Sequence, residues 1–141
     1  MDYKRFGDTY ILRLNKGEEI CESLMALAER EGIALAQLSG LGAVDELILG
    51  LFDHRAQRYI TNPFIGAYEI TALNGTITTM EGKPHLHIHI SAGDIRGNAV
   101  GGHLQRATIS VTAEILVRVL PGQVERRYDP EAGINVMELG D

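Results

Sequence analysis

The spacing of apolar residues predicts one helix in the first part of the chain. From Glu18 to about Glu31, apolar residues recur every three or four positions, and Gly32 follows as a C-cap. Asn15 stands three positions before Glu18, which predicts an N-cap at Asn15. The recurring apolar residues are Ile20, Leu24, Leu27 and Ala28. The pattern therefore predicts a single amphipathic helix.

Alternation of apolar and polar residues predicts strands along most of the remaining chain, most clearly in residues 85–91 and 107–119. The second segment places six apolar side chains on one face, namely Ile109, Val111, Ala113, Ile115, Val117 and Val119. Shorter strands are predicted over residues 9–14, 33–38, 44–52, 68–73 and 76–80, and short strands are expected between residues 124 and 139. We therefore expect one α+β domain, residues 1–141, built mainly of strands.

Two glycine-containing segments interrupt the strand pattern. Residues 39–42, Ser-Gly-Leu-Gly, lack the third glycine of a dinucleotide-binding loop and are followed by a strand rather than a helix, so a turn or bulge is the better interpretation. Asn74-Gly75 predicts either a hairpin turn or a bulge, and the local sequence leaves both open.

Composition excludes several classes of protein. The apolar runs are short and interrupted and the N-terminus has no apolar signal core, so we expect no membrane helix and a cytoplasmic location. The only cysteine, Cys21, excludes an internal disulfide and is expected to be a buried structural thiol. The net charge is −6, and the only dense basic points are the pairs Lys4-Arg5 and Arg126-Arg127. Tight DNA binding by this chain alone is therefore not expected.

Histidines carry the strongest chemical signal, because four of the five lie within 19 residues: His85, His87, His89 and His103. The first three share one face of a predicted strand, with Leu86, Ile88 and Ile90 on the opposite, core face. Positions two residues apart on a strand lie about 6.5 to 7 Å apart, so two neighbouring imidazoles can converge on one metal ion. The outer pair, His85 and His89, is too widely spaced to do so.

His103 is the candidate for a third ligand. A polar loop over residues 93–98 lets the chain turn back, and Gly101 and Gly102 permit close approach of the backbone just before His103. Three histidines with one open position are typical of catalytic zinc, and iron, nickel or manganese are alternatives. The competing interpretation is a row of solvated histidines on an exposed sheet face.

Glu69 and Glu114 are the candidate catalytic carboxylates. Each lies in a predicted strand whose opposite face is apolar, and a curved sheet would turn that polar face toward the histidines. The alternative for both is an ordinary solvated glutamate.

Several segments, taken in order, resemble the plant and prokaryote conserved domain (PPC or PCC domain). They are LSGLGA at residues 38–43, Tyr68-Glu69-Ile70 with Leu73-Asn74-Gly75, HIHISAGD at 87–94, VGGHL at 100–104 and TAEI at 112–115. Single pieces such as GGHL are weak signals, whereas the ordered set is specific. The resemblance extends from about Tyr10 to Val119.

This resemblance implies a strongly bent, mainly antiparallel sheet, a helix packed on it and a homotrimer. The fold group is similar to that of acetolactate decarboxylase, which holds zinc with a His-x-His pair and a later Gly-Gly-His. The resemblance thus implies His87, His89 and His103 as ligands and gives His85 no role. The loop between His89 and His103 differs in length from the decarboxylase pattern, so the decarboxylase reaction is not transferred.

Two hypotheses about function remain. The first is a metal-binding homotrimer with a small-molecule ligand or an enzymatic role. The second is a DNA-associated or regulatory module, because plant members follow AT-hook motifs and prokaryotic members are often labelled DNA-binding by that association. The chain has no Arg-Gly-Arg-Pro core of an AT-hook and no basic arm, which favours the first hypothesis.

Overall fold

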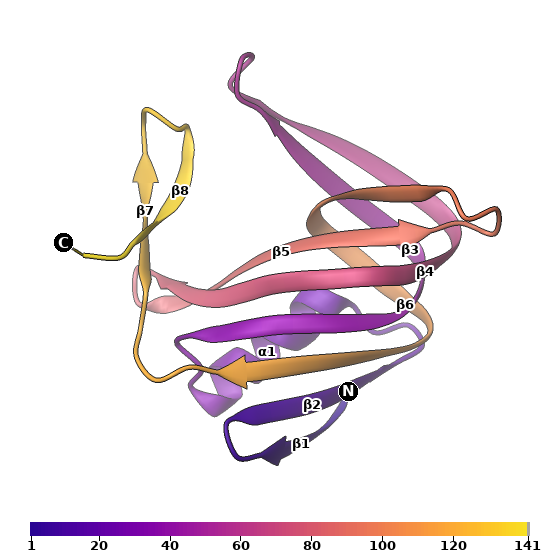
Figure 1. Ribbon diagram of the computed structural model, residues 1–141, viewed down its shortest axis with the longest axis horizontal. Coiled ribbons are helices and arrows are strands. Elements are labelled where there is room, and N and C mark those ends of the chain that lie inside the picture. The colour runs from indigo at the N-terminus through magenta and orange to yellow at the C-terminus, as the bar shows by residue number, and fades with distance from the viewer. Residues whose placement is uncertain (141) are drawn as a thin grey trace.

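The structure is a computed structural model that describes residues 1–140. These residues form one helix and eight strands (Figure 1). Their bounds are β1 Asp2–Phe6, β2 Thr9–Asn15, α1 Ile20–Glu31, β3 Ala36–Asp53, β4 Arg58–Met80, β5 Lys83–Gly93, β6 Ala99–Val119, β7 Glu125–Asp129 and β8 Ile134–Glu138. The fold is therefore α+β and dominated by strands, as the sequence predicts. Among residues 1–140, no helix has both the length and the apolar character that crossing a membrane requires.

The strands form one mixed, mostly antiparallel sheet in the order β1-β2-β6-β3-β4-β7-β8. The exception is a parallel bridge between β4 and β7. β5 lies off this path and pairs with both β4 and β6. Since β3 also pairs with both β4 and β6, pairing among β3, β4, β5 and β6 closes into a ring. This closure brings the beginning of β6 beside β5.

α1 begins one residue after Glu19, which is its N-cap: the Glu19 carboxylate accepts a hydrogen bond from the backbone of Glu22 at 2.6 Å. The predicted N-cap at Asn15 is wrong, because its side chain caps nothing here and its backbone N–H donates to the Glu18 carboxylate. Gly32 ends the helix in the left-handed conformation, φ 64°, as predicted. Glu19 also accepts from the backbone of Ala107, so the cap fixes the helix to β6.

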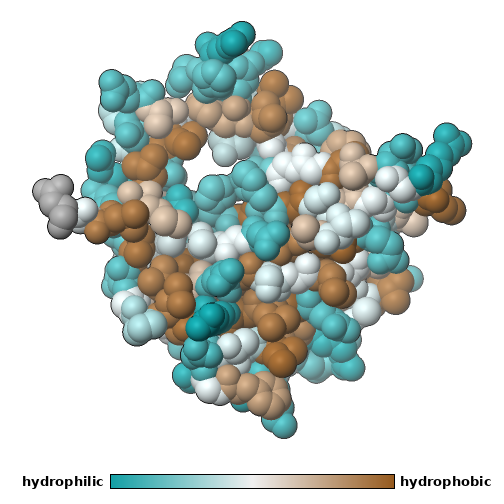
Figure 2. Space-filling view, viewed as in Figure 1, coloured by the Kyte–Doolittle hydropathy of each residue, from teal (hydrophilic) through white to brown (hydrophobic). Residues whose placement is uncertain are grey.

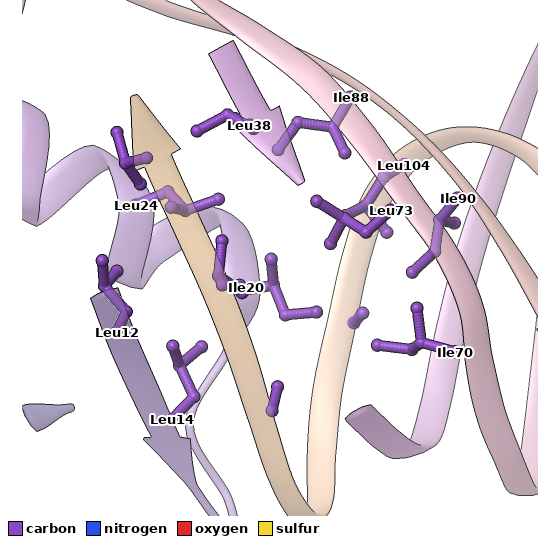
Figure 3. Packing of buried hydrophobic residues seen from close by; sticks show 14 of the residues in the cluster. Leu12, Leu14, Ile20, Leu24, Leu38, Ile70, Leu73, Ile88, Ile90 and Leu104 are labelled. Atoms are coloured by element: carbon purple, nitrogen blue, oxygen red, sulfur yellow. The ribbon is translucent and has the colours of Figure 1, made fainter. Parts of the chain in front are cut away.

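One hydrophobic cluster joins the helix to the sheet. The buried helix residues are Ile20, Leu24, Leu27 and Ala28, the four whose spacing predicts the helix. Figure 3 shows Ile20 and Leu24 beside residues of several strands, among them Leu12, Leu38 and Ile88. Ile88 and Ile90 of β5 are buried, which confirms that these two residues face the core. Leu86, predicted on the same face, is only half-buried against this cluster.

Val111 does not share the buried face predicted for β6 and is 68% exposed. The register of the β3–β6 pair explains this difference. Gly42 lies opposite Ala113 and Val44 lies opposite Ile109, so β6 advances by four residues between these two pairs while β3 advances by two. Residues 110–112 of β6 therefore stand against Ala43 alone, and Val111 leaves the core in the resulting bulge.

Both glycine segments lie inside continuous strands. The predicted strand 44–52 and the second half of the predicted strand 33–38 are one strand, β3, whereas residues 33–35 precede it as a bend. Residues 39–42 take part in a bulge rather than a turn. Likewise, segments 68–73 and 76–80 belong to β4. Asn74 and Gly75 are neither a turn nor a bulge, because both pair in regular register with β3 and with β5. Pairing on both sides overrides the local turn preference.

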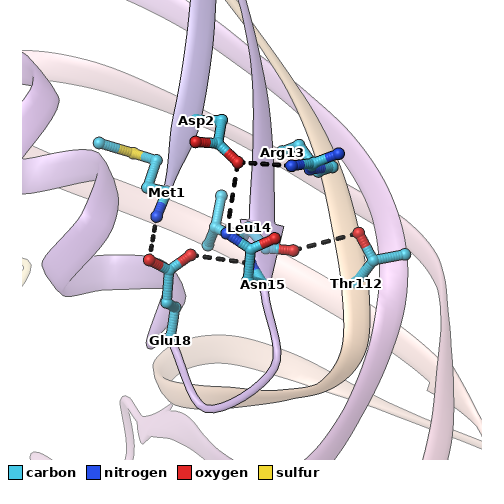
Figure 4. A network of polar contacts seen from close by, with 7 residues as sticks. All are labelled: Met1, Asp2, Arg13, Leu14, Asn15, Glu18 and Thr112. Atoms are coloured by element: carbon cyan, nitrogen blue, oxygen red, sulfur yellow. Dashed lines mark hydrogen bonds and ion pairs between the residues drawn. The ribbon is translucent and has the colours of Figure 1, made fainter.

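The beginning of the chain is held by a polar network at the β2–α1 connection (Figure 4). The Met1 amino group contacts the Glu18 carboxylate, and Asp2 pairs with Arg13 at 2.6 Å. Thr112 of β6 donates to the Leu14 carbonyl at 3.1 Å. These contacts join β1, which the sequence pattern does not predict, to β2, and join β2 to β6.

Candidate metal centre

Two neighbouring strands bring three histidines together. On β5, His87 and His89 lie two residues apart and therefore on the same face. On β6, His103 is the direct partner of His89 in the antiparallel register. Directly opposed residues point to the same side of a sheet, so His103 joins the face of His87 and His89.

The three rings surround a common point. Ring centroids are 5.1 Å apart for His87 and His89, 5.3 Å for His87 and His103, and 5.8 Å for His89 and His103. One nitrogen from each ring lies within 4.8 Å of those of the other two. Tetrahedral zinc with Zn–N bonds of about 2.0–2.1 Å needs nitrogens about 3.3 Å apart. Side-chain rotations that move each nitrogen by roughly 1 Å would close this gap.

His85 lies on the same strand face but outside this group of three. It is half-buried and lines the same cavity as the other histidines. It lies two residues before His87 and four before His89 on β5, so it is one same-face position beyond His87.

The protonation states suit metal binding. Burial, assisted by the Arg126 charge and the neighbouring histidines, lowers the pKa of His87 to about 4. Burial also lowers the pKa of His103 and of His85, with a further contribution from nearby positive groups. A metal ion binds neutral imidazole, so at neutral pH His87 and His103 need not release a proton before they can bind the ion.

Arg126 of β7 is a site residue that the sequence pattern does not reveal. Its side chain is only 6% exposed, and burial lowers the pKa of the guanidinium. Nη2 lies 3.4 Å from His87 Nδ1. In the sequence Arg126 appears only as half of a basic pair, and a single bridge between Thr79 and Glu125 connects its strand to β4. No local signal could have placed it beside the histidines.

A cavity of about 610 Å³ opens over the histidines. Figure 2 shows the hollow between the β3–β4 hairpin and the C-terminal β7–β8 hairpin. The lining residues come from six strands and the β7–β8 turn: Gly50, Leu51, Phe52, Tyr59, His85, Leu86, His87, His89, Gly102, His103, Arg126, Tyr128, Gly133, Ile134 and Asn135. None of these residues is acidic.

The structure does not bring Glu69 or Glu114 to this site. Both are exposed, and neither belongs to the histidine group or lines the cavity. Glu69 lies opposite Gly93 at the far end of β5, and Glu114 lies opposite Leu41 and Arg13, eleven positions beyond His103 on β6. Cys21 is half-buried on α1, and burial beside Glu19 and Glu22 raises the pKa of its thiol to about 12.

The donor set fits a divalent metal ion. Three converging imidazoles, at least two of them held neutral, match the ligand preference of zinc and of other divalent transition metals. A fourth position would remain for water or a ligand. No carboxylate among residues 1–140 joins the group, which argues against a calcium or magnesium site.

A known domain family matches most of the chain. The profile of the Plants and Prokaryotes Conserved (PCC) domain matches residues 1–121. The chain belongs to this family. The match ends before β7, so Arg126 and the β7–β8 hairpin lie outside the matched part of this PCC domain.

Solved structures share this fold along nearly the whole chain. A candidate DNA-binding protein from Bacteroides thetaiotaomicron is 32% identical, with a TM-score of 0.95 over 97% of this chain and 96% of that one. The metal-containing protein AF0104 from Archaeoglobus fulgidus is 28% identical, with a TM-score of 0.88 over 98% of this chain and 99% of that one. A Staphylococcus aureus protein described as similar to alpha-acetolactate decarboxylase shares the fold at 14% identity, with a TM-score of 0.58 over 86% of this chain and 56% of that one.

A curated relative is much longer than this chain. The bifunctional protein GlmU from a Synechococcus strain is 31% identical over 127 residues, which are 88% of this chain but 19% of that protein. The PCC domain thus spans about a fifth of the length of this relative.

Proposed function

We propose that this PCC domain binds one divalent metal ion through His87, His89 and His103. Zinc is the first candidate, and iron, nickel and manganese are the alternatives. The observation that supports this proposal most directly is that one nitrogen of each imidazole lies within 4.8 Å of those of the other two. The three rings come from two strands that pair His89 with His103. The metal-containing relative from Archaeoglobus fulgidus supports the proposal.

The role proposed for this site is the binding or conversion of a small molecule. A bound metal would act as a Lewis acid at its open position. The chain supplies the rest: a cavity of about 610 Å³, apolar and aromatic walls, and the Arg126 guanidinium. Glu69 and Glu114 would reach the site only from a second subunit or after a movement of the sheet. They remain candidates for catalysis only in such an arrangement.

Elemental analysis tests metal binding directly. We expect the protein, purified without a histidine tag and dialysed against metal-free buffer, to retain close to one equivalent of a divalent metal. A chelator should remove the ion, and added zinc should restore it. A protein that neither retains nor takes up any divalent metal at micromolar concentration would overturn the assignment.

DNA binding is the second candidate function, favoured by the description of the Bacteroides thetaiotaomicron structure. Charge opposes it: the chain carries −6, and its two basic pairs do not form a tract. Arg126 is buried and Arg127 is paired with Glu138 at 2.8 Å, so the second pair offers little to a phosphate backbone.

We therefore expect no DNA complex tighter than micromolar at physiological salt. A gel-shift titration with mixed duplexes measures this, with the same titration at low salt as a control for weak non-specific contacts. A sequence-specific nanomolar complex would establish the second function instead.

A further inference from the structure

A buried guanidinium beside the histidines has no anionic partner. Arg126 donates from Nε to Thr78 Oγ1 at 2.9 Å and from Nη1 to the Asn135 carbonyl at 3.1 Å. Its third contact is between Nη2 and His87 Nδ1 at 3.4 Å. All three partners are neutral. Among residues 1–140, no carboxylate oxygen lies within 4.0 Å of Arg126, and no acidic residue lines the cavity.

This arrangement is costly without a counter-ion. Removing a charge from water is strongly unfavourable unless an opposite charge or strong hydrogen bonds offset it. The neighbouring Arg127 shows the usual solution, because it remains exposed and pairs with Glu138. Arg126 instead keeps its charge inside a cavity of a chain whose net charge is −6.

Metal binding, the function proposed above, would increase the positive charge and free a donor. Arginine only donates hydrogen bonds, so His87 Nδ1 accepts in the contact with Nη2. A metal on Nδ1 would take that lone pair, and a metal on Nε2 would leave the proton on Nδ1. In either case His87 can no longer accept from Arg126.

We propose that Arg126 anchors the carboxylate of a small organic acid that binds next to the metal ion. This inference rests on the proposed metal site and names the class of ligand that it takes. Arginine has five N–H groups. Thr78 and Asn135 use two of them, which leaves enough donors for both oxygens of a carboxylate. Leu51, Phe52 and Ile134 supply apolar wall for the rest of the ligand.

Calorimetric titration of the zinc-loaded protein with butyrate tests the proposal. We expect wild-type protein to bind butyrate, and R126M to bind it at least tenfold more weakly while retaining its zinc. The matched control is R127M, which removes the adjacent exposed arginine and should bind butyrate as the wild type does. Equal binding by R126M and wild type, or no binding by wild type at millimolar butyrate, would overturn the proposal.

A measurement on the wild type covers the case in which R126M fails to fold. Butyrate should shift the Arg126 Nε–H resonance in an NMR titration and leave that of Arg127 in place; the reverse pattern would contradict the proposal. Inorganic phosphate is the comparison ligand, and tighter binding of phosphate than of butyrate would refute the carboxylate assignment. Metal content is measured separately, so a protein that binds no metal would refute the proposed metal site. Titration of the metal-free protein with butyrate would still test the role of Arg126.

Discussion

At the scale of residues, the site depends on three imidazoles in unequal settings: His87 and His103 are half-buried and His89 is exposed. Replacing His103 by alanine removes one of the three proposed ligands and leaves the core residues Ile88 and Ile90 untouched. Loss of an outer-shell partner alone typically costs 10–100-fold in metal affinity, so we expect H103A to bind metal about 100-fold more weakly or worse.

Competition between the protein and a chromogenic chelator measures this affinity. H85A is the matched control, because His85 shares the strand face but not the group of three ligands. We expect H85A to retain its metal. If H85A releases the metal and H103A does not, the ligand assignment is wrong.

The lowered pKa of His87 predicts a pH dependence for the metal-free protein. The folded chain takes up this proton only near pH 4, whereas the unfolded chain takes it up near the ordinary value of about 6.5. The unfolded state therefore binds more protons in this range, and the free energy of unfolding should fall as the pH falls from about 6.5 toward 4. Urea denaturation in the presence of a chelator measures it. H87Q should show a shallower fall, and an identical slope would contradict the assignment.

At the scale of elements, the position of β5 depends on its close approach to β4. A Cβ built on Gly75 would lie 2.5 Å from the His87 carbonyl oxygen, so any larger residue must push β5 away. We expect G75A to lower the free energy of unfolding by about 1–3 kcal/mol and to weaken metal binding, because His87 and His89 move with the strand.

Urea denaturation and metal titration of G75A test this coupling. G93A is a suitable control on β5 itself, because a Cβ at Gly93 would make only an ordinary contact at 3.8 Å with Thr71. A stable G75A protein with normal metal affinity would show that this approach does not position the histidines.

At the scale of the whole molecule, we predict self-association into a trimer. Large apolar side chains remain exposed on the sheet, among them the opposed residues Ile11 and Leu116, at 46% and 44%. The edge strands β1 and β8 also present unpaired backbone groups. Light scattering should give three times the chain mass of 15.4 kDa, independent of concentration in the micromolar range. A monomer under these conditions would refute the prediction.

The sequence by itself determined the features that depend on local patterns. Helical spacing predicts the buried residues of α1, and alternation predicts that Ile88 and Ile90 face the core while the histidines face the other side. The ordered motifs around His87 and His103 are sufficient to predict the PCC family and the three histidines that the structure brings together. These features follow from the period of a helix or strand and from residue type, both of which a single segment contains.

Only the tertiary structure decided the features that depend on pairing between distant segments. Asn74-Gly75 lies in an unbroken strand because β3 and β5 bind it from both sides, and Val111 leaves the core because β6 is longer than β3 between their paired positions. Glu69 and Glu114 lie away from the histidines, although their local patterns resemble those of site residues. Arg126 enters the site through the C-terminal hairpin, 39 positions from His87. Its place is set by the packing of distant strands, which no local pattern of residues encodes.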